Sequence, residues 1–140
     1  MNKKELSKYY YLTLEIKDIE NKLKEIRNQS SGVARMTGMP FSSQVGNPTE
    51  KQVMLIEKYT EKLEKKKVQA MEEIIKIESY ITEIKDVETR LIFNKRYIEL
   101  KKWDVIAREM NMCERGVFKR HSDYLKGIRN VWLLKIIKKI

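Results

Sequence analysis

Hydrophobic residues near the start of the chain recur in steps of three and four positions, with mostly charged residues between them. They are Tyr9, Leu12, Ile16, Ile19, Leu23 and Ile26. Such steps place side chains along one face of a helix, in the seam typical of coiled coils. Asn2 and Glu5 have the spacing of a capping box. The pattern therefore predicts a helix over residues 2–28.

A second and longer seam follows a break over residues 29–46, whose composition is typical of a loop. Asn47 and Pro48 predict a new helix that has Asn47 as its cap and Pro48 at its first helical position. The seam in this helix consists of Val53, Ile56, Thr60, Leu63, Lys67, Ala70, Ile74, Ile77, Ile81 and Ile84. Two such helices predict an antiparallel coiled-coil hairpin over residues 1–85. The longer helix leaves part of its seam uncovered, so we expect a homo-oligomer, with a dimer favoured.

Residues 86–140 have shorter periodic segments and predict a separate helical module. A helix over 86–98 is expected to supply a small core, through Val87, Leu91, Ile92 and Tyr97. Further along, Ala107 provides a small residue where two helices cross, and Asn111 tolerates a left-handed turn. Val117 then packs back into the core. This spacing is typical of a helix-turn-helix whose second helix begins near Glu114. The expected fold class is therefore all-α, with a three-helix module at the C-terminus.

The charge of the chain indicates a polyanionic partner. Its 30 Lys/Arg and 20 Asp/Glu residues give a net charge of +10, and residues 86–140 hold 14 of the basic residues against 7 acidic ones. We therefore expect double-stranded DNA as the partner. An α-helix fits the major groove, where base edges are expected to be read by Glu114, Arg115, Phe118, Lys119 and Ser122. Phosphates are expected to be contacted by Lys101, Lys102, Arg108 and Arg120.

Other classes of function find little support in the sequence. Cys113 is the single cysteine, which excludes a disulfide within the chain and fits a reducing, cytoplasmic setting. We find no phosphate-binding glycine loop, no metal-ligand cluster and no histidine paired with a nucleophile, so we expect neither an enzyme nor a cofactor or metal. His121 is interpreted as a packing or phosphate-contacting residue. No segment has the pattern of a signal peptide or of a membrane span, and no membrane partner is expected.

The last thirteen residues, 128–140, form a basic amphipathic pattern. Its apolar positions are Val131, Trp132, Leu133, Leu134, Ile136, Ile137 and Ile140, with lysines between them. Helices of this kind lie on membranes in some proteins. Because this segment directly follows a small three-helix core, packing against that core or across a dimer is the favoured interpretation.

The C-terminal module resembles the promoter-reading C-terminal domain of sigma factors. The similar positions are Asp86-x-x-x-Arg90, Arg96-Tyr97-Ile98, Trp103-x-x-Ile106-Ala107 and Glu114-Arg115-x-Val117. Over nearly its whole length the chain is more similar to sigma-like phage regulators of the RinA/ArpU late-gene activator type, including a Gly-Met-Pro loop at 38–40. The resemblance implies a phage or prophage transcription regulator that acts inside a bacterial host cell.

The chain departs from that family pattern at a few positions. Leu100 and Lys102 replace the usual glycine and Ser/Thr before Trp103, Cys113 replaces the usual serine cap, and Arg120 replaces an aliphatic residue. Two alternatives to a DNA-binding regulator stay open. One is a small terminase-like DNA-packaging factor, and the other is an adaptor that binds RNA polymerase and little DNA.

Overall fold

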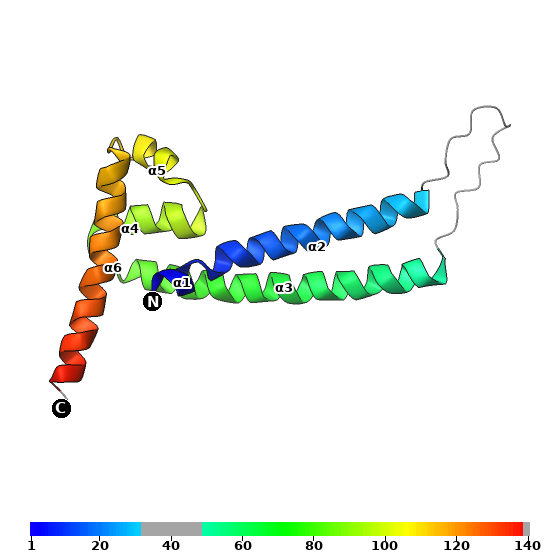
Figure 1. The fold of residues 1–140 in the computed structure, drawn as a ribbon, viewed down its shortest axis with the longest axis horizontal. Helices are drawn as coiled ribbons and strands as arrows, with labels where there is room; N and C mark the ends of the chain where they lie inside the picture. Colours follow the sequence, from blue (N-terminus) through cyan, green and yellow to red (C-terminus); the bar gives the residue numbers. More distant parts are fainter. Residues whose placement is uncertain (32–48, 139–140) are drawn as a thin grey trace. The chain divides into compact units, whose positions relative to one another are not determined.

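The computed structural model of the chain describes residues 1–31 and 49–138, with side chains throughout except at 30–31 and 128–133. Every regular element in these residues is helical, which confirms the all-α expectation for them (Figure 1). The elements are α1 (Lys3–Leu6), α2 (Lys8–Ser31), α3 (Glu50–Thr82), α4 (Val87–Phe93), the π-helical turn η1 (Asn94–Ile98), α5 (Trp103–Glu109) and α6 (Glu114–Ile137).

The chain starts with the predicted capping box. The Asn2 side chain accepts a hydrogen bond from the Glu5 amide at 2.9 Å, and the Asn2 amide donates to the Glu5 carboxylate at 2.7 Å. Instead of one continuous helix, a turn at Ser7 separates α1 from α2. α2 runs on to Ser31, so the first three residues of the predicted loop are helical. The remainder of that loop, with its Gly-Met-Pro run, lies outside the described residues.

Helix α3 begins at Glu50 within the described residues. The predicted cap and first helical position, Asn47 and Pro48, lie outside the described residues. At the observed start, the Thr49 amide donates to the Gln52 side chain at 3.2 Å, and the Thr49 carbonyl accepts from the Gln52 and Val53 amides. The Gln52 side chain, in the first turn of α3, thus accepts a hydrogen bond from the amide of Thr49, the residue before the helix.

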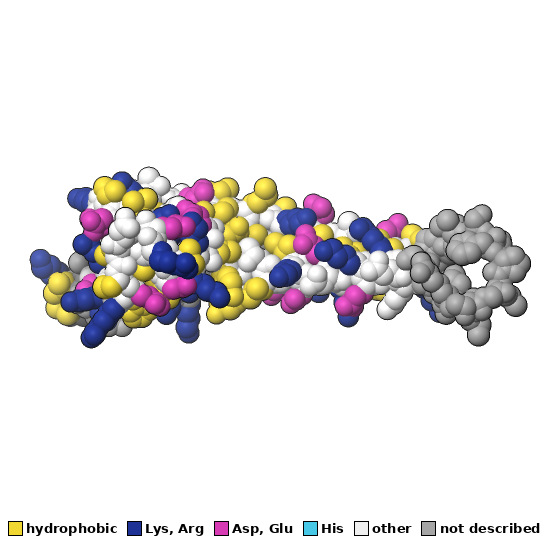
Figure 2. Space-filling view, turned by 90° about the horizontal axis from the view of Figure 1, so that it is seen from above, with side chains coloured by type: hydrophobic (Ala, Val, Ile, Leu, Met, Phe, Trp, Pro, Cys, Tyr) yellow, Lys and Arg dark blue, Asp and Glu magenta, His cyan; other side chains and the backbone are white. Residues whose placement is uncertain are grey.

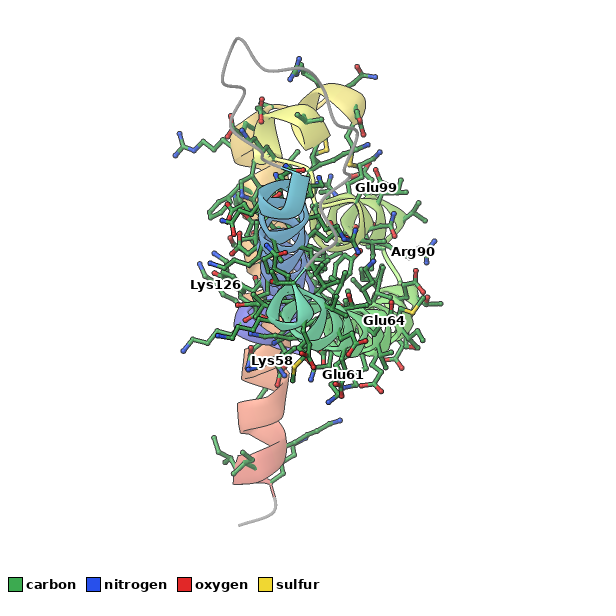
Figure 3. The ribbon with its side chains drawn as sticks, turned by 90° about the vertical axis from the view of Figure 1, so that its right-hand side faces the viewer. Lys58, Glu61, Glu64, Arg90, Glu99 and Lys126 are labelled. Atoms are coloured by element: carbon green, nitrogen blue, oxygen red, sulfur yellow. The ribbon has the colours of Figure 1, made fainter. Side chains whose placement is uncertain are left out.

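Contacts divide the chain into two units, which are residues 1–11 together with 71–140, and residues 12–70. In the unit of residues 12–70, α2 and α3 run side by side in opposite directions (Figure 1). Ile19, Leu23 and Leu63 are buried between them. Lys66 pairs with Glu15 at 2.6 Å, and charged residues such as Lys58, Glu61 and Glu64 lie on the exposed surface of α3 (Figure 3).

The other unit contains two apolar clusters. The first joins the N-terminus, the end of α3 and the α4–η1 segment, through Leu6, Ile77, Ile81, Ile84, Phe93 and Tyr97. The second joins α4 to α5 and α6, through Ile92, Ile106, Ala107 and Val117. Arg90 links α4 to the end of α3, because its guanidinium donates to the Ile84 carbonyl at 3.1 Å (Figure 3). The core of this unit thus draws on segments from both ends of the chain.

The expected core of the 86–98 segment needs two corrections. Ile92 and Tyr97 are buried as predicted, but Val87 and Leu91 are 56% and 44% exposed. Phe93, which was not predicted, is fully buried instead. Val87, Leu91 and Phe93 all lie in α4, before the π-helical turn. Packing decides which of its faces is buried, since Phe93 joins the cluster at the end of α3 and Ile92 joins the cluster with α5 and α6.

The C-terminal segment also differs from expectation. α6 is a single helix of 24 residues, so residues 128–137 continue it and form no separate helix. Leu134, Ile136 and Ile137 are exposed, which makes the expected packing on the chain's own core wrong for these three residues. The side chains of Val131, Trp132 and Leu133, and residue Ile140, lie outside the described set.

Candidate nucleic-acid interface

The turn between α5 and α6 follows the geometry that the residue spacing predicted. Asn111 has a φ of 52°, in the left-handed region, directly after the end of α5. The Met112 amide donates to the Ala107 carbonyl at 2.9 Å, and the Asn111 amide donates to the Arg108 carbonyl at 3.3 Å. These two bonds form a Schellman motif, which satisfies the last carbonyls of α5. Ala107 on α5 and Val117 on α6 are buried in the same apolar cluster.

A second left-handed residue lies before α5. Leu100 has a φ of 56°. The Lys101 amide donates a hydrogen bond to the Lys95 carbonyl at 2.9 Å, which closes this turn. The Arg96 guanidinium donates to the Lys101 carbonyl at 2.8 Å and lies 4.7 Å from the centre of the Trp103 ring. This cation–π contact holds the first residue of α5 in place. Leu100 therefore adopts a backbone conformation that glycine adopts without steric cost.

The inner face of α6 carries a buried histidine, His121. His121 is 2% exposed, and its Nε2 is hydrogen-bonded to the Tyr97 hydroxyl at 2.7 Å. Its ring lies 4.9 Å from those of Phe93 and Trp103, measured between ring centres. Burial, together with the positive charges of Lys3 and Arg96, lowers the pKa of His121 to about 4. His121 is therefore a neutral packing residue, in agreement with one of its two expected roles.

The outer face of α6 carries most of the residues predicted to read bases. Glu114, Arg115, Phe118 and Lys119 are exposed, and Ser122 is half-buried. They share one face because their spacing of one, three or four positions matches the helical repeat. The predicted inward-facing set is also observed, since Val117 and His121 are buried and Tyr124 and Leu125 are half-buried.

The four cations predicted to contact phosphates fall into two groups. Lys101 is paired with Glu109 at 2.7 Å and with Glu99 at 2.6 Å, and these carboxylates raise the pKa of its ammonium. Arg120 is paired with Glu88 at 2.5 Å. Lys102, in contrast, is exposed and has no ion pair among the described residues, and Arg108 makes only a 3.4 Å contact with Asp104 on the surface of α5.

The base-reading candidates add two more unpaired cations. Arg115 and Lys119 are exposed and have no acidic partner within the described part of the chain. Figure 2 shows basic side chains projecting from this unit beside acidic and hydrophobic ones. The net charge of residues 86–140 already includes these carboxylates, and the ion pairs show which cations they neutralise locally, Lys101 and Arg120. Among the residues predicted to contact DNA, Arg115, Lys119, Lys102 and Arg108 are the cations that remain available to an external anion.

A shallow hollow of about 410 Å³ opens beside this face of α6. Its lining consists of Trp103, Glu114, Arg115 and Phe118. The Phe118 and Trp103 rings meet edge to face, with their centres 5.5 Å apart. The sequence did not predict this hollow, because the contact between the two rings depends on how α5 crosses α6.

Two further classes of site have no counterpart in the described residues. No group of three or more His, Cys, Asp or Glu side chains is placed to hold a metal ion there. No helix within the same ranges is long and apolar enough to cross a membrane. Comparisons of the chain with protein-family models, with curated proteins and with solved structures found no match.

Proposed function

We propose that this chain binds double-stranded DNA with sequence preference, using α5 and α6 as a helix-turn-helix. In this proposal the exposed face at the start of α6 enters the major groove, and Arg115 and Lys119 reach base edges. The observation that carries the proposal is the combination of a buried Ala107–Val117 crossing with unpaired cations on the outer face.

The ion pairs within the chain indicate which cations are free to contact phosphates in this proposal. Lys102 and Arg108 are the better candidates, since Lys101 and Arg120 would first have to leave their carboxylate partners. Breaking those pairs reduces what a phosphate contact gains. The proposed role is that of a phage or prophage transcription regulator, which rests on the sequence resemblance. The α2–α3 pair would serve as a coiled-coil arm that holds two such modules in one oligomer.

The deciding experiment is selection of bound duplexes from a random pool by the full chain. We expect one enriched motif, and we expect affinity to fall steeply with salt concentration. Equal affinity for all duplexes, or binding that does not depend on salt, would contradict the proposal. A motif with two half-sites would indicate a dimer, whereas a ring-sized oligomer in light scattering would favour the DNA-packaging alternative.

Two matched variants test the assignment of the cations. Lys102→Ala is expected to weaken binding to all duplexes and to reduce the slope of log affinity against log salt by about 1, as for the loss of one phosphate contact. Lys101→Ala is expected to change that slope less, because Lys101 is already neutralised within the chain. Arg115→Ala is expected to relax the preference at one base pair, with little change in the salt slope.

A further inference from the structure

The hollow beside α6 has walls that differ from the rest of the proposed DNA-facing surface. Phe118 is 47% exposed and stands on that surface, while every other exposed side chain predicted to read bases is charged. Trp103, which lines the same hollow, is half-buried and contacts the Arg96 guanidinium at 4.7 Å and the His121 ring at 4.9 Å. The fold behind Trp103 therefore positions its ring, and Phe118 packs edge to face against it.

The charge around the hollow indicates what kind of molecule occupies it. Arg115 and Glu114 line the hollow itself, and Lys119 lies one turn beyond Arg115 on the same face of α6. Neither cation has an acidic partner among the described residues. A surface that combines aromatic walls with free cations suits a polyanion that also carries an apolar group. Duplex DNA meets both requirements through its phosphates and through the groups in its major groove.

Only one common group in the major groove is apolar. Guanine, adenine and cytosine present hydrogen-bond donors and acceptors there, whereas thymine also presents its C5-methyl group. We propose that the Trp103–Phe118 hollow receives the 5-methyl group of a pyrimidine in duplex DNA, either thymine or 5-methylcytosine. This inference rests on the proposed function and adds a specificity-determining residue, Phe118, to it. Arg115 on the same lining would then read the base pair beside the methylated pyrimidine.

The test uses the enriched duplex from the selection experiment and the full chain. Each thymidine is replaced in turn by deoxyuridine, which removes only the methyl group and leaves base pairing unchanged. We expect affinity to fall about 3- to 10-fold at one position of each half-site and to stay unchanged at the others, as for one or two apolar carbons returned to water. At that position, 5-methylcytosine paired with guanine is expected to bind more tightly than unmodified cytosine.

Variants then connect the methyl group to the hollow. Phe118→Ala is expected to bind duplexes containing thymidine and deoxyuridine equally, whereas Phe118→Leu keeps an apolar wall and part of the distinction. Lys119→Ala serves as the matched control, since it weakens binding but retains the thymidine preference. Because Phe118 is half exposed, we expect the alanine variant to keep its helical circular dichroism spectrum.

The outcomes separate this inference from the proposed function. Selective binding in which deoxyuridine matches thymidine at every position would overturn the methyl-reading role alone. Retention of the distinction by a folded Phe118→Ala variant would overturn it as well. If the selection yields no preferred duplex at all, the proposed function fails, and the inference that rests on it fails too.

Discussion

Leu100 and Asn111 have positive φ values and lie on either side of α5, where the chain changes direction. Asn111 suits its position, since asparagine visits the left-handed region more readily than most residues. Leu100 does not, because its Cβ crowds the following carbonyl in that conformation, at a cost of roughly 1–2 kcal/mol. The surrounding turn holds it there through the Lys101-to-Lys95 backbone bond and the Arg96 guanidinium.

A comparison of Leu100→Gly with Leu100→Ala isolates this strain. Both variants lose the leucine side chain, but only glycine adopts a φ of 56° without steric cost. We expect the glycine variant to be more stable than the alanine variant by about 1 kcal/mol in urea unfolding. At an ordinary helical position the order is reversed, so an alanine variant of equal or greater stability would contradict the assigned conformation.

His121 makes the folding stability depend on pH. Burial lowers its folded-state pKa to about 4, below the ordinary value of 6.5. Between these two values the unfolded chain binds a proton that the folded chain does not, so acid favours unfolding. The stabilisation from the neutral ring is complete above pH 6.5 and is lost as the pH falls toward 4.

We expect the free energy of unfolding to fall by up to about 3 kcal/mol between pH 7 and pH 4 from this residue. Chemical denaturation at a series of pH values measures the change. The His121→Gln variant removes the titrating ring but keeps a polar side chain, and its stability should decline less over the same range. Parallel pH profiles for the two proteins would show that His121 does not cause the decline.

At the scale of elements, α6 combines a weak start with unusual length. Cys113 is its N-cap residue and makes no side-chain hydrogen bond to the first turn. Its Sγ lies 3.1 Å from the point where a Cβ on Gly116 would stand, so the thiol already lies over that turn. The helix nevertheless begins at Glu114 as predicted, because Val117 and His121 anchor its inner face. Tertiary packing therefore compensates for the missing cap.

A hydroxyl at position 113 is expected to supply the missing cap. Cys113→Ser places an oxygen that can accept a hydrogen bond from an amide of the first turn, which stabilises a helix by about 1 kcal/mol. Cys113→Ala is the matched control, since it removes the sulfur without adding an acceptor. Thermal unfolding should rank serine above alanine, and equal midpoints for the two variants would argue against this reading of the cap.

At the scale of the whole molecule, the end of α6 has apolar side chains that no other described residue covers. Leu134 and Ile137 are 57% and 65% exposed and lie three residues apart on one helix, with Lys135 between them. Since packing on the chain's own core is not observed for them, pairing with a second copy is the remaining favoured interpretation of this segment. It agrees with the homo-oligomer expected from the uncovered seam of α3.

The double variant Leu134→Lys and Ile137→Lys tests that interpretation. We expect the natural chain to be a dimer in light scattering at micromolar concentration, and the variant to shift toward monomer because charged side chains resist burial. The double variant Val68→Lys and Met71→Lys changes exposed apolar residues of α3 that lie outside its seam, also three positions apart, and serves as the control. A natural chain that is monomeric throughout would rule out pairing through the end of α6.

The sequence alone was sufficient to predict α2, the body of α3, the start of α6 and the turn between α5 and α6. Heptad steps and helix signals depend on residues a few positions apart, so they identify α2, the body of α3 and the first cap. The same holds for Ala107, Asn111 and Val117, whose spacing specifies a left-handed turn between two crossing helices. Errors arose where burial depends on which neighbouring helices pack on a face, as at Val87, Leu91 and Phe93.

Only the tertiary structure decided which residues share a core and which charges are free. Leu6 and Phe93 lie far apart in the sequence, yet both are fully buried in one cluster, and no local period links them. Lys101 and Lys102 are adjacent, yet the fold brings Glu109 to the first and no acidic group to the second, among the described residues. Ion pairs and apolar contacts depend on distances in space, which a count of residues along the chain does not contain.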